Sequence, residues 1–251
     1  MDGRAGLVIA QYPALDGCHV NSNPSLSPEE IQRHNELYNR ACRLLDGLVI
    51  LDDQPHENPG FFARRRLRQA VQLFQQVIEL NPANWQPMVF IGKAFQSLGE
   101  LEPALTWLLR AHDCVPAHPS VAKEVGFAAG RLGHHEVAVR VMQVAAKEHP
   151  EDAALHLNLG LSCLMSGKSA DAREAFARAV ELEPKRDMNK RLLSLVRDVE
   201  AESGPAQKLK PKLHKPSNKK PLEPIAHRFL VIARVPLSGG YWRSARQRYL
   251  A

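Results

Sequence analysis

Few residues of this 251-residue chain stand at the spacings that catalytic or metal-binding chemistry requires. The stretch SGKS, residues 166–169, resembles the end of a phosphate-binding loop. Such a loop needs a glycine five positions before Gly167, and Ser162 stands there. His134 and His135 are adjacent, so their side chains point apart, and no cysteine or carboxylate is spaced to complete a metal site. No Ser-His-Asp or Cys-His arrangement emerges either, so we expect neither an enzyme nor a bound metal or cofactor.

The cysteines and the apolar runs bear on the compartment. The four cysteines are scattered, and none forms a Cys-x-x-Cys pair, which is typical of reduced thiols in a cytosolic protein. The longest unbroken apolar runs have four or five residues, whereas a membrane-spanning helix needs about 18. The apolar stretch at residues 7–10 is shorter than the core of a signal peptide, about 7–15 residues. We therefore expect a cytoplasmic protein without a transmembrane segment.

The net charge of +6 combines two unlike parts. From Gly204 onward, six lysines and five arginines face one acid, Glu223, which gives +10. The first 203 residues therefore carry 6 − 10 = −4, and an acidic body precedes a basic tail. The candidate binding residues of the tail are its lysines, Lys208, Lys210, Lys212, Lys215, Lys219 and Lys220.

The tail has two segments of different composition. Residues 207–224 are rich in proline and lysine and offer almost nothing to bury, so we expect an extended, partly disordered linker. Residues 227–251 combine a strand-like run, a Gly-Gly turn and a short basic piece. The cations of the tail are suited to nucleic-acid phosphates, to an anionic membrane or to the acidic body of this chain. A solubilising tail without a ligand is the simplest alternative.

A 34-residue period runs through the acidic body. Prolines recur at Pro82, Pro116, Pro150 and Pro184. Three further kinds of residue keep the same step: glycine at 92, 126 and 160 and again at 99, 133 and 167, alanine at 70, 104, 138 and 172, and a large apolar residue at 74, 108, 142 and 176. This period indicates helical hairpins that must stack, because one hairpin cannot bury both of its faces.

Each column of the period suggests a structural role. The glycines at 99, 133 and 167 are predicted to end the first helix of each hairpin in a left-handed conformation. The glycines at 92, 126 and 160 fall inside helices, where glycine costs about 1 kcal/mol relative to alanine. We expect close approach of two helix backbones to offset this cost, and the large apolar column to fill the space between successive hairpins. The prolines are predicted to end the second helices.

Residues 85–186 resemble the tetratricopeptide repeat. The family pattern has a glycine in the first helix, alanine and a large apolar residue in the second, and a final proline. The segments IGKAFQSLGELEPALTWLLRAHDCVP and LGLSCLMSGKSADAREAFARAVELEP follow it. The tryptophan usual early in the first helix is absent at Met88, Ala122 and His156. The resemblance implies an all-α, right-handed α-solenoid with three complete repeats, 85–118, 119–152 and 153–186.

The flanks complete the predicted organisation. After an irregular segment, 1–26, residues 27–84 are expected to form a long, degenerate first hairpin. Its first helix opens with a capping box of Ser27 and Glu30, with Pro28 at the first helical position. A capping helix over 187–203 and the basic tail, 204–251, follow the three repeats.

The resemblance implies a non-catalytic adaptor or scaffold that binds a protein segment in a concave groove lined by the first helices. By position in the repeat, the groove residues are Gln86, Val89, Lys93, Gln96, Ser120, Lys123, Phe127, Leu157, Asn158 and Leu161. Their mixture of lysine, amide and apolar side chains suits an extended peptide or a helix with some acidic character. The alternative for Phe127 and the leucines is a place in the core, under the capping helix.

Other functions stay open at this point. One is a protein associated with nucleic acid or an anionic membrane through the basic tail. Another is the N-terminal repeat part of a larger enzyme whose catalytic domain follows the tail. Self-association through the edge repeats is a further expectation, and the sequence does not identify the protein partner.

Overall fold

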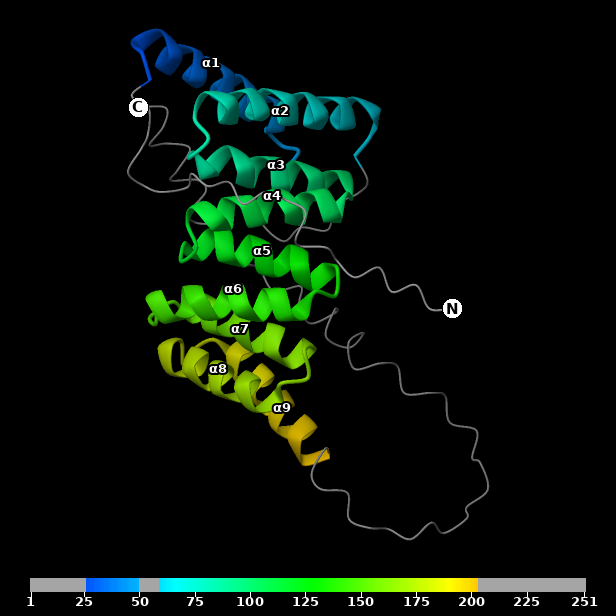
Figure 1. Cartoon of the computed structure of the whole chain (residues 1–251). Helices are drawn as coiled ribbons and strands as arrows, with labels where there is room; N and C mark the ends of the chain where they lie inside the picture. Colours follow the sequence, from blue (N-terminus) through cyan, green and yellow to red (C-terminus); the bar gives the residue numbers. More distant parts are fainter. Residues whose placement is uncertain (1–25, 50–58, 203–251) are drawn as a thin grey trace, which may run out of the picture.

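The computed structural model describes residues 26–49 and 59–202, and these residues form helices without any strand. Each helix packs against the next in chain order, which builds a stack of antiparallel hairpins (Figure 1). The helices are α1 (Pro28–Leu45), α2 (Phe61–Leu80), α3 (Trp85–Leu98), α4 (Leu101–Cys114), α5 (Pro119–Arg131), α6 (His135–Glu148), α7 (Ala153–Met165), α8 (Ser169–Leu182) and α9 (Asp187–Glu202). The all-helical solenoid that the repeat predicted is confirmed for these residues. The expectations for residues 1–25 and for the tail lie outside them.

The start of α1 follows the predicted capping box. The Ser27 hydroxyl accepts a hydrogen bond from the Glu30 backbone N–H at 3.2 Å, and the Glu30 carboxylate accepts one from the Ser27 N–H at 2.8 Å. Pro28 occupies the first turn, where its missing N–H leaves no helical hydrogen bond unmade. The sequence alone therefore fixes where α1 begins.

Glycine and proline set the ends of the repeat helices. Gly99, Gly133 and Gly167 have φ values of +80°, +78° and +78°, in the left-handed region that favours glycine. Helices α2, α4, α6 and α8 each end two residues before one of the four periodic prolines. Both predictions about helix ends are confirmed.

The glycines inside the first helices face mainly a side chain of the second helix, and close backbones are only part of the cause. A Cβ atom at Gly160 would lie 2.5 Å from Cε1 of Phe176, and one at Gly92 would lie 2.6 Å from Cγ of Leu108. The large apolar side chain of the second helix therefore occupies the gap left by the glycine of its own hairpin. At Gly92 the backbone carbonyl oxygen of Ala104 also lies only 3.3 Å from such a Cβ, so close backbones contribute there, whereas at Gly126 and Gly160 the bulky side chain alone requires the glycine.

The large apolar column also joins neighbouring hairpins at one point. The Phe74 ring of α2 stacks on Phe90 of α3, with centroids 5.3 Å apart, and Tyr38 of α1 meets Phe74 edge-on. At the other end of the stack, Leu192 and Val196 of α9 are buried in a cluster with Phe176. Helix α9 thus covers the last repeat, as a capping helix would.

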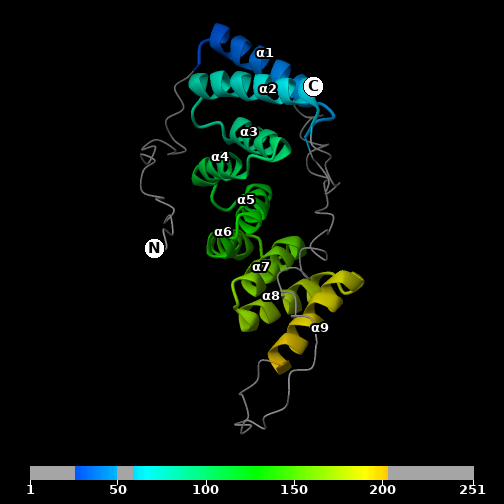
Figure 2. The ribbon, with the colours of Figure 1, turned by 90° about the vertical axis from the view of Figure 1, so that its right-hand side faces the viewer.

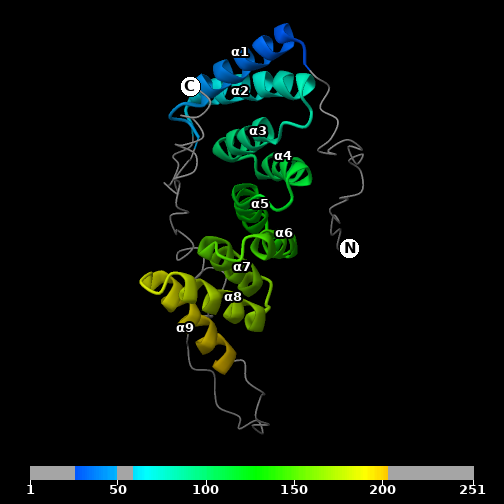
Figure 3. The same cartoon turned by 90° about the vertical axis from the view of Figure 1, so that its left-hand side faces the viewer.

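The stack curves toward its first helices. Helix α5 contacts both α3 and α7 along the stack, whereas α4, α6 and α8 show no comparable contact with one another. Figures 2 and 3 show the hairpins from two opposite sides and the change in their direction from α1 to α9. We call the surface formed by α3, α5 and α7 the inner face.

Candidate functional site

All ten residues that the sequence predicted for the groove lie on α3, α5 and α7, but at different depths. Val89 and Leu157 are 0% and 1% exposed and belong to the core. Both stand one repeat from Lys123, and both belong to the clusters of buried apolar side chains that form the core. We correct the expectation for these two residues. The Lys93 and Gln96 side chains are also buried, while Gln86, Ser120, Lys123, Asn158 and Leu161 are half-buried.

Two ion pairs tie the first helices together across the repeats. The Lys93 ammonium of α3 donates to the Glu124 carboxylate of α5, and these side chains are only 7% and 16% exposed. The Lys123 ammonium of α5 donates to Oδ2 of Asp152 at 2.7 Å. The lysines that the sequence assigned to the groove are thus already neutralised by this chain. The sequence analysis did not predict their acidic partners, Glu124 and Asp152. The signal that could have found them is an opposite charge about one repeat further along the chain.

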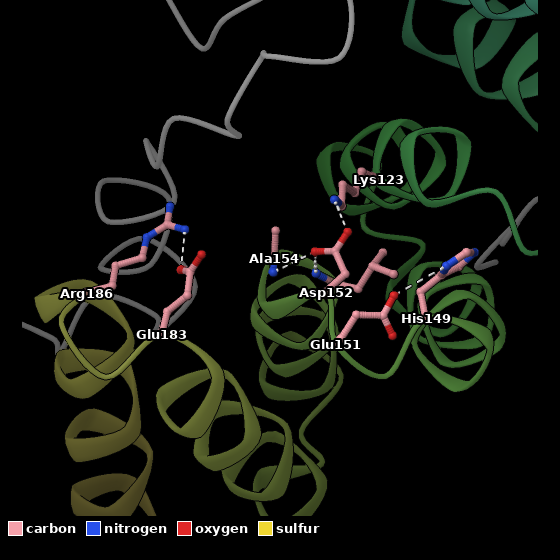
Figure 4. A network of polar contacts seen from close by, with 8 residues as sticks. Lys123, His149, Glu151, Asp152, Ala154, Glu183 and Arg186 are labelled. Carbon is pink, nitrogen blue, oxygen red and sulfur yellow. Dashed lines mark hydrogen bonds and ion pairs between the residues drawn. The ribbon is translucent and has the colours of Figure 1, made fainter.

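Asp152 connects this pairing to the start of α7 (Figure 4). Its Oδ1 atom accepts hydrogen bonds from the backbone N–H groups of Ala154 at 2.9 Å and Leu155 at 3.1 Å. Burial by itself raises the pKa of the Asp152 carboxyl. The hydrogen bond and charge of Lys123, together with the two N–H groups, outweigh burial and lower the pKa overall. Asp152 is therefore held as a carboxylate that both caps α7 and anchors α5.

A histidine interrupts the column of capping residues. Asn84 and Asp152 begin α3 and α7 with side-chain capping bonds, but His118, one repeat from each, makes none at the start of α5. Its ring instead packs on Trp85, with centroids 4.5 Å apart. Burial lowers the pKa of His118, and the charges of His149 and Lys123 lower it further. His118 is consequently neutral at pH 7 and adds aromatic surface rather than charge.

His149 itself lies on the loop that joins α6 to α7. Its Nδ1 atom is 3.9 Å from a carboxylate oxygen of Glu151, as Figure 4 shows beside the Lys123–Asp152 pair. The Glu183–Arg186 pair, at 3.0 Å, occupies the corresponding loop before α9. On each of these two loops, an acidic side chain thus lies close to a basic side chain of the same loop.

The centre of the inner face carries an exposed aromatic side chain. Phe127 of α5 is 39% exposed, and the Arg131 guanidinium carbon lies 5.8 Å from the centre of its ring. One turn further along α5, a Cβ atom at Gly130 would have no neighbour within 4 Å. Gln96 and Leu164 occupy the position of Gly130 in the adjoining repeats. The middle repeat thus combines an exposed ring with open space beside it.

Two amide donors on this face lack acceptors. Within the described part of the chain, Nδ2 of Asn158 and Nε2 of Gln96 are buried and have no hydrogen-bond partner. A buried donor without an acceptor costs about 1–3 kcal/mol. Both residues were predicted from the sequence to line the groove. That their amide donors have no acceptor is seen only in the structure.

The chemistry available among the described residues is that of contact rather than of metal binding. No group of three or more histidine, cysteine or acidic side chains gathers there. Burial raises the pKa of the Cys163 thiol to about 11, so this thiol is protonated at neutral pH. No helix between residues 26 and 202 is both long and apolar enough to cross a bilayer. The six tail lysines lie outside the described residues, and their role stays a prediction.

Solved structures of MamA are among those with a similar fold. A crystal structure of MamA aligns with a TM-score of 0.55 and 14% identity, covering 68% of this chain and 84% of that one. MamA from Desulfovibrio magneticus RS-1, from residue 41 to its end, gives a TM-score of 0.53 and 19% identity, covering 67% and 86%. At such identities the likeness concerns the fold alone. No curated protein shows a significant sequence match.

The match to a family model is more specific. Residues 60–119 and 127–187 match the tetratricopeptide repeat model. The helical hairpins and the periodic glycine, alanine and proline columns lie largely within these two segments. Repeats of this kind form protein-interaction scaffolds in general, and these scaffolds are typically non-catalytic. Residues 60–119 and 127–187 of this chain therefore belong to the tetratricopeptide repeat family.

Proposed function

We propose that this protein is a non-catalytic scaffold that holds a segment of another protein against the inner face. The single observation that carries the proposal is Phe127, a large aromatic side chain left 39% exposed in the middle of that face. Its position in the neighbouring repeats is occupied by Lys93, which is buried, and by Leu161, which is half-buried. Only the middle repeat of the three presents an aromatic ring there.

The surroundings of Phe127 suit one protruding apolar side chain of a partner. Gly130 leaves open space beside the ring, and the helix accepts a glycine there although alanine would stabilise it by about 1 kcal/mol. No packing neighbour accounts for this glycine, unlike the three glycines that accommodate Leu108, Met142 and Phe176. An apolar side chain placed over Gly130 would lie next to Phe127, which stands three residues earlier on the same helix.

Charge has a secondary part in this recognition. Because Lys93 and Lys123 already bind Glu124 and Asp152, the inner face presents less positive charge than its sequence suggests. The remaining exposed cation near the ring is Arg131, which is positioned to orient a carboxylate or a backbone carbonyl. We infer that the partner segment is mainly apolar, with at most one acidic group next to its anchoring side chain.

Hydrogen bonds to the partner backbone would come from amides. Nδ2 of Asn158 lacks an acceptor, and a rotation of its side chain would offer this donor to a backbone carbonyl. Stacked hairpins fix these groups before binding, so the partner bears most of the cost of ordering. This arrangement supports an extended segment that crosses α5 and α7.

Site-specific photo-cross-linking tests the proposal. A photoreactive phenylalanine analogue replaces Phe127 in one full-length variant and Val144 in a second. Val144 is the matched control, because it is equally exposed, at 39%, but lies on α6, a second helix. We expect protein adducts from position 127 in the native cell extract and few from position 144. Adducts of equal yield at both positions, or only at 144, would contradict the proposal.

Binding through the tail remains the second candidate. In that case the protein would bind an anionic partner through the lysines from Lys208 to Lys220, and binding would weaken steeply as the salt concentration rises. Cross-linking at position 127 separates the two, because a tail-bound partner has no reason to reach the inner face.

A further inference from the structure

Helix α2 is longer than the second helices of the complete repeats. It has 20 residues, whereas α4, α6 and α8 have 14 each. Counting back one repeat from the start of α4 at Leu101 gives Leu67, so residues 61–66 extend beyond the repeat frame. At 1.5 Å per residue, this overhang adds about 9 Å to the helix. It belongs to the hairpin at the end of the stack (Figure 1).

The overhang is fixed to α1 at its base. The Arg66 guanidinium donates to the backbone carbonyls of Arg43 at 3.3 Å and Asp46 at 3.2 Å, at the end of α1. Arg68, the second residue of the repeat frame, pairs with Glu100 at 2.7 Å. These contacts hold the direction of α2, so the residues before Arg66 project from a rigid support.

Two phenylalanines form the tip of the overhang. Phe61 and Phe62 are 75% and 77% exposed, the highest values among the large apolar side chains of the described residues. Their rings meet edge to face, with centroids 5.5 Å apart and planes at 79°. No core side chain covers them. Such exposure of two adjacent aromatic rings is unfavourable in water and needs a reason outside the fold.

Cations surround this aromatic tip. Arg64, Arg65 and Arg68 line a shallow hollow on α2 together with Phe61. Arg64 and Arg65 make no ion pair with any described residue, and the first turn of α2 contains no acid. Arginine at the start of a helix opposes the helix dipole, at a cost of about 0.3–1 kcal/mol each. Helix stability therefore does not explain these arginines.

We propose that residues 61–65 of the overhang dock on an anionic phospholipid surface. Phe61 and Phe62 would enter the boundary between headgroups and acyl chains, and Arg64 and Arg65 would contact the lipid phosphates. In such a bilayer, anionic headgroups lie within a few ångströms of apolar acyl chains. This arrangement matches the exposed phenylalanines and the adjacent arginines at the tip. The site is separate from the inner face, so attachment here would leave that face free for a partner.

The geometry of the rings favours lipid over single-stranded nucleic acid. Bases stack on aromatic faces, and consecutive bases need platforms that lie roughly parallel. The planes of Phe61 and Phe62 are nearly perpendicular, and the edge of one ring covers the face of the other. A compact apolar wedge of this shape suits insertion between lipids.

Co-sedimentation of the full-length protein with vesicles tests the proposal. Vesicles of phosphatidylcholine with 30% phosphatidylserine, about the anionic share that gives a marked surface potential, are compared with pure phosphatidylcholine. The variants are Phe61→Ala/Phe62→Ala and Arg64→Gln/Arg65→Gln, with Phe127→Ala and Arg140→Gln as controls for an exposed aromatic and an exposed arginine elsewhere. A further variant changes all six tail lysines to glutamine, because the tail would also attract anionic lipid. Circular dichroism checks that helicity is retained.

We expect binding to the anionic vesicles that falls about tenfold or more in each overhang variant and stays within about twofold in the two controls. The tail variant should keep binding that still depends on the two phenylalanines. The proposal is overturned if the overhang variants bind like the wild type, if binding vanishes with the tail lysines alone, or if the wild type does not bind. Retention of a single-stranded oligonucleotide that depends on Phe61 and Phe62, without lipid binding, would overturn it in favour of nucleic acid.

Discussion

At the scale of single residues, the repeat pairs one glycine with one bulky side chain. Gly92, Gly126 and Gly160 each leave room for the large apolar residue of the second helix in the same hairpin. The pairs differ in how easily the bulky partner can move. Phe176 is a fully buried ring, whereas the atom nearest to Gly126 is the terminal methyl of Met142, the end of a flexible side chain.

This difference predicts an order of stability for three glycine variants. Gly160→Ala should lower the free energy of unfolding by about 1–3 kcal/mol, because its Cβ would lie 2.5 Å from the Phe176 ring. Gly126→Ala should be nearly neutral, since the Met142 methyl can swing away and alanine favours the helix by about 1 kcal/mol. Gly130→Ala, with no neighbour within 4 Å, should stabilise the protein. Urea unfolding measures all three, and a Gly126→Ala variant as unstable as Gly160→Ala would refute the packing argument.

Sequence alone identified which glycines matter but not why. The period revealed Gly92, Gly126 and Gly160, since a periodic pattern records which positions are constrained. The constraint itself depends on which side chain of the neighbouring helix points into the gap, and no pattern along one chain contains that direction. For the same reason Val89 and Leu157 were assigned to the groove, although both side chains are buried in the core.

At the scale of helices, ion pairs set how one first helix lies against the next. Lys123 and Asp152 join α5 to the start of α7, and Asp152 also caps α7. The repeat pattern predicted both helices and their ends because glycine and proline act locally. It did not predict this pairing, because the two partners stand on different repeats and neither belongs to an invariant column.

Asp152 should make this junction sensitive to acid. Its pKa is lowered from the ordinary value of 3.8 in the folded protein, so its stabilising effect is complete above about pH 4 and is lost as the pH falls through the folded value. Asp152→Asn keeps a capping oxygen but loses the ion pair, and should cost about 1 kcal/mol at pH 7. Asp152→Ala, which loses both, should cost about 2 kcal/mol.

Urea unfolding of the three proteins between pH 7 and pH 3 checks this. The gap between wild type and Asp152→Asn should be constant down to about pH 4 and narrow below it. A gap that widens toward pH 3, or one that is absent at pH 7, would show that the Lys123–Asp152 pair contributes nothing at this junction.

At the scale of the whole molecule, the stack separates two surfaces with different roles. The inner face is formed by three first helices and centres on Phe127, while the overhang of α2 ends in Phe61 and Phe62 at one end of the solenoid. The period predicted the stack and which helix of each hairpin comes first. It could not predict that the overhang is exposed, because residues 61–66 precede the first repeated column. Their exposure also depends on how much longer α2 is than the other second helices.

The central claim is that the inner face is the protein-binding surface. The most direct test is a calorimetric titration of the segment recovered from the cross-links at position 127, made as a peptide, into wild type, Phe127→Ala and Val144→Ala. We predict that Phe127→Ala weakens binding about tenfold or more, which corresponds to about 1.4 kcal/mol, and that Val144→Ala changes it less than about twofold. Equal affinities for the wild type and Phe127→Ala, or a larger loss for Val144→Ala, would contradict the account.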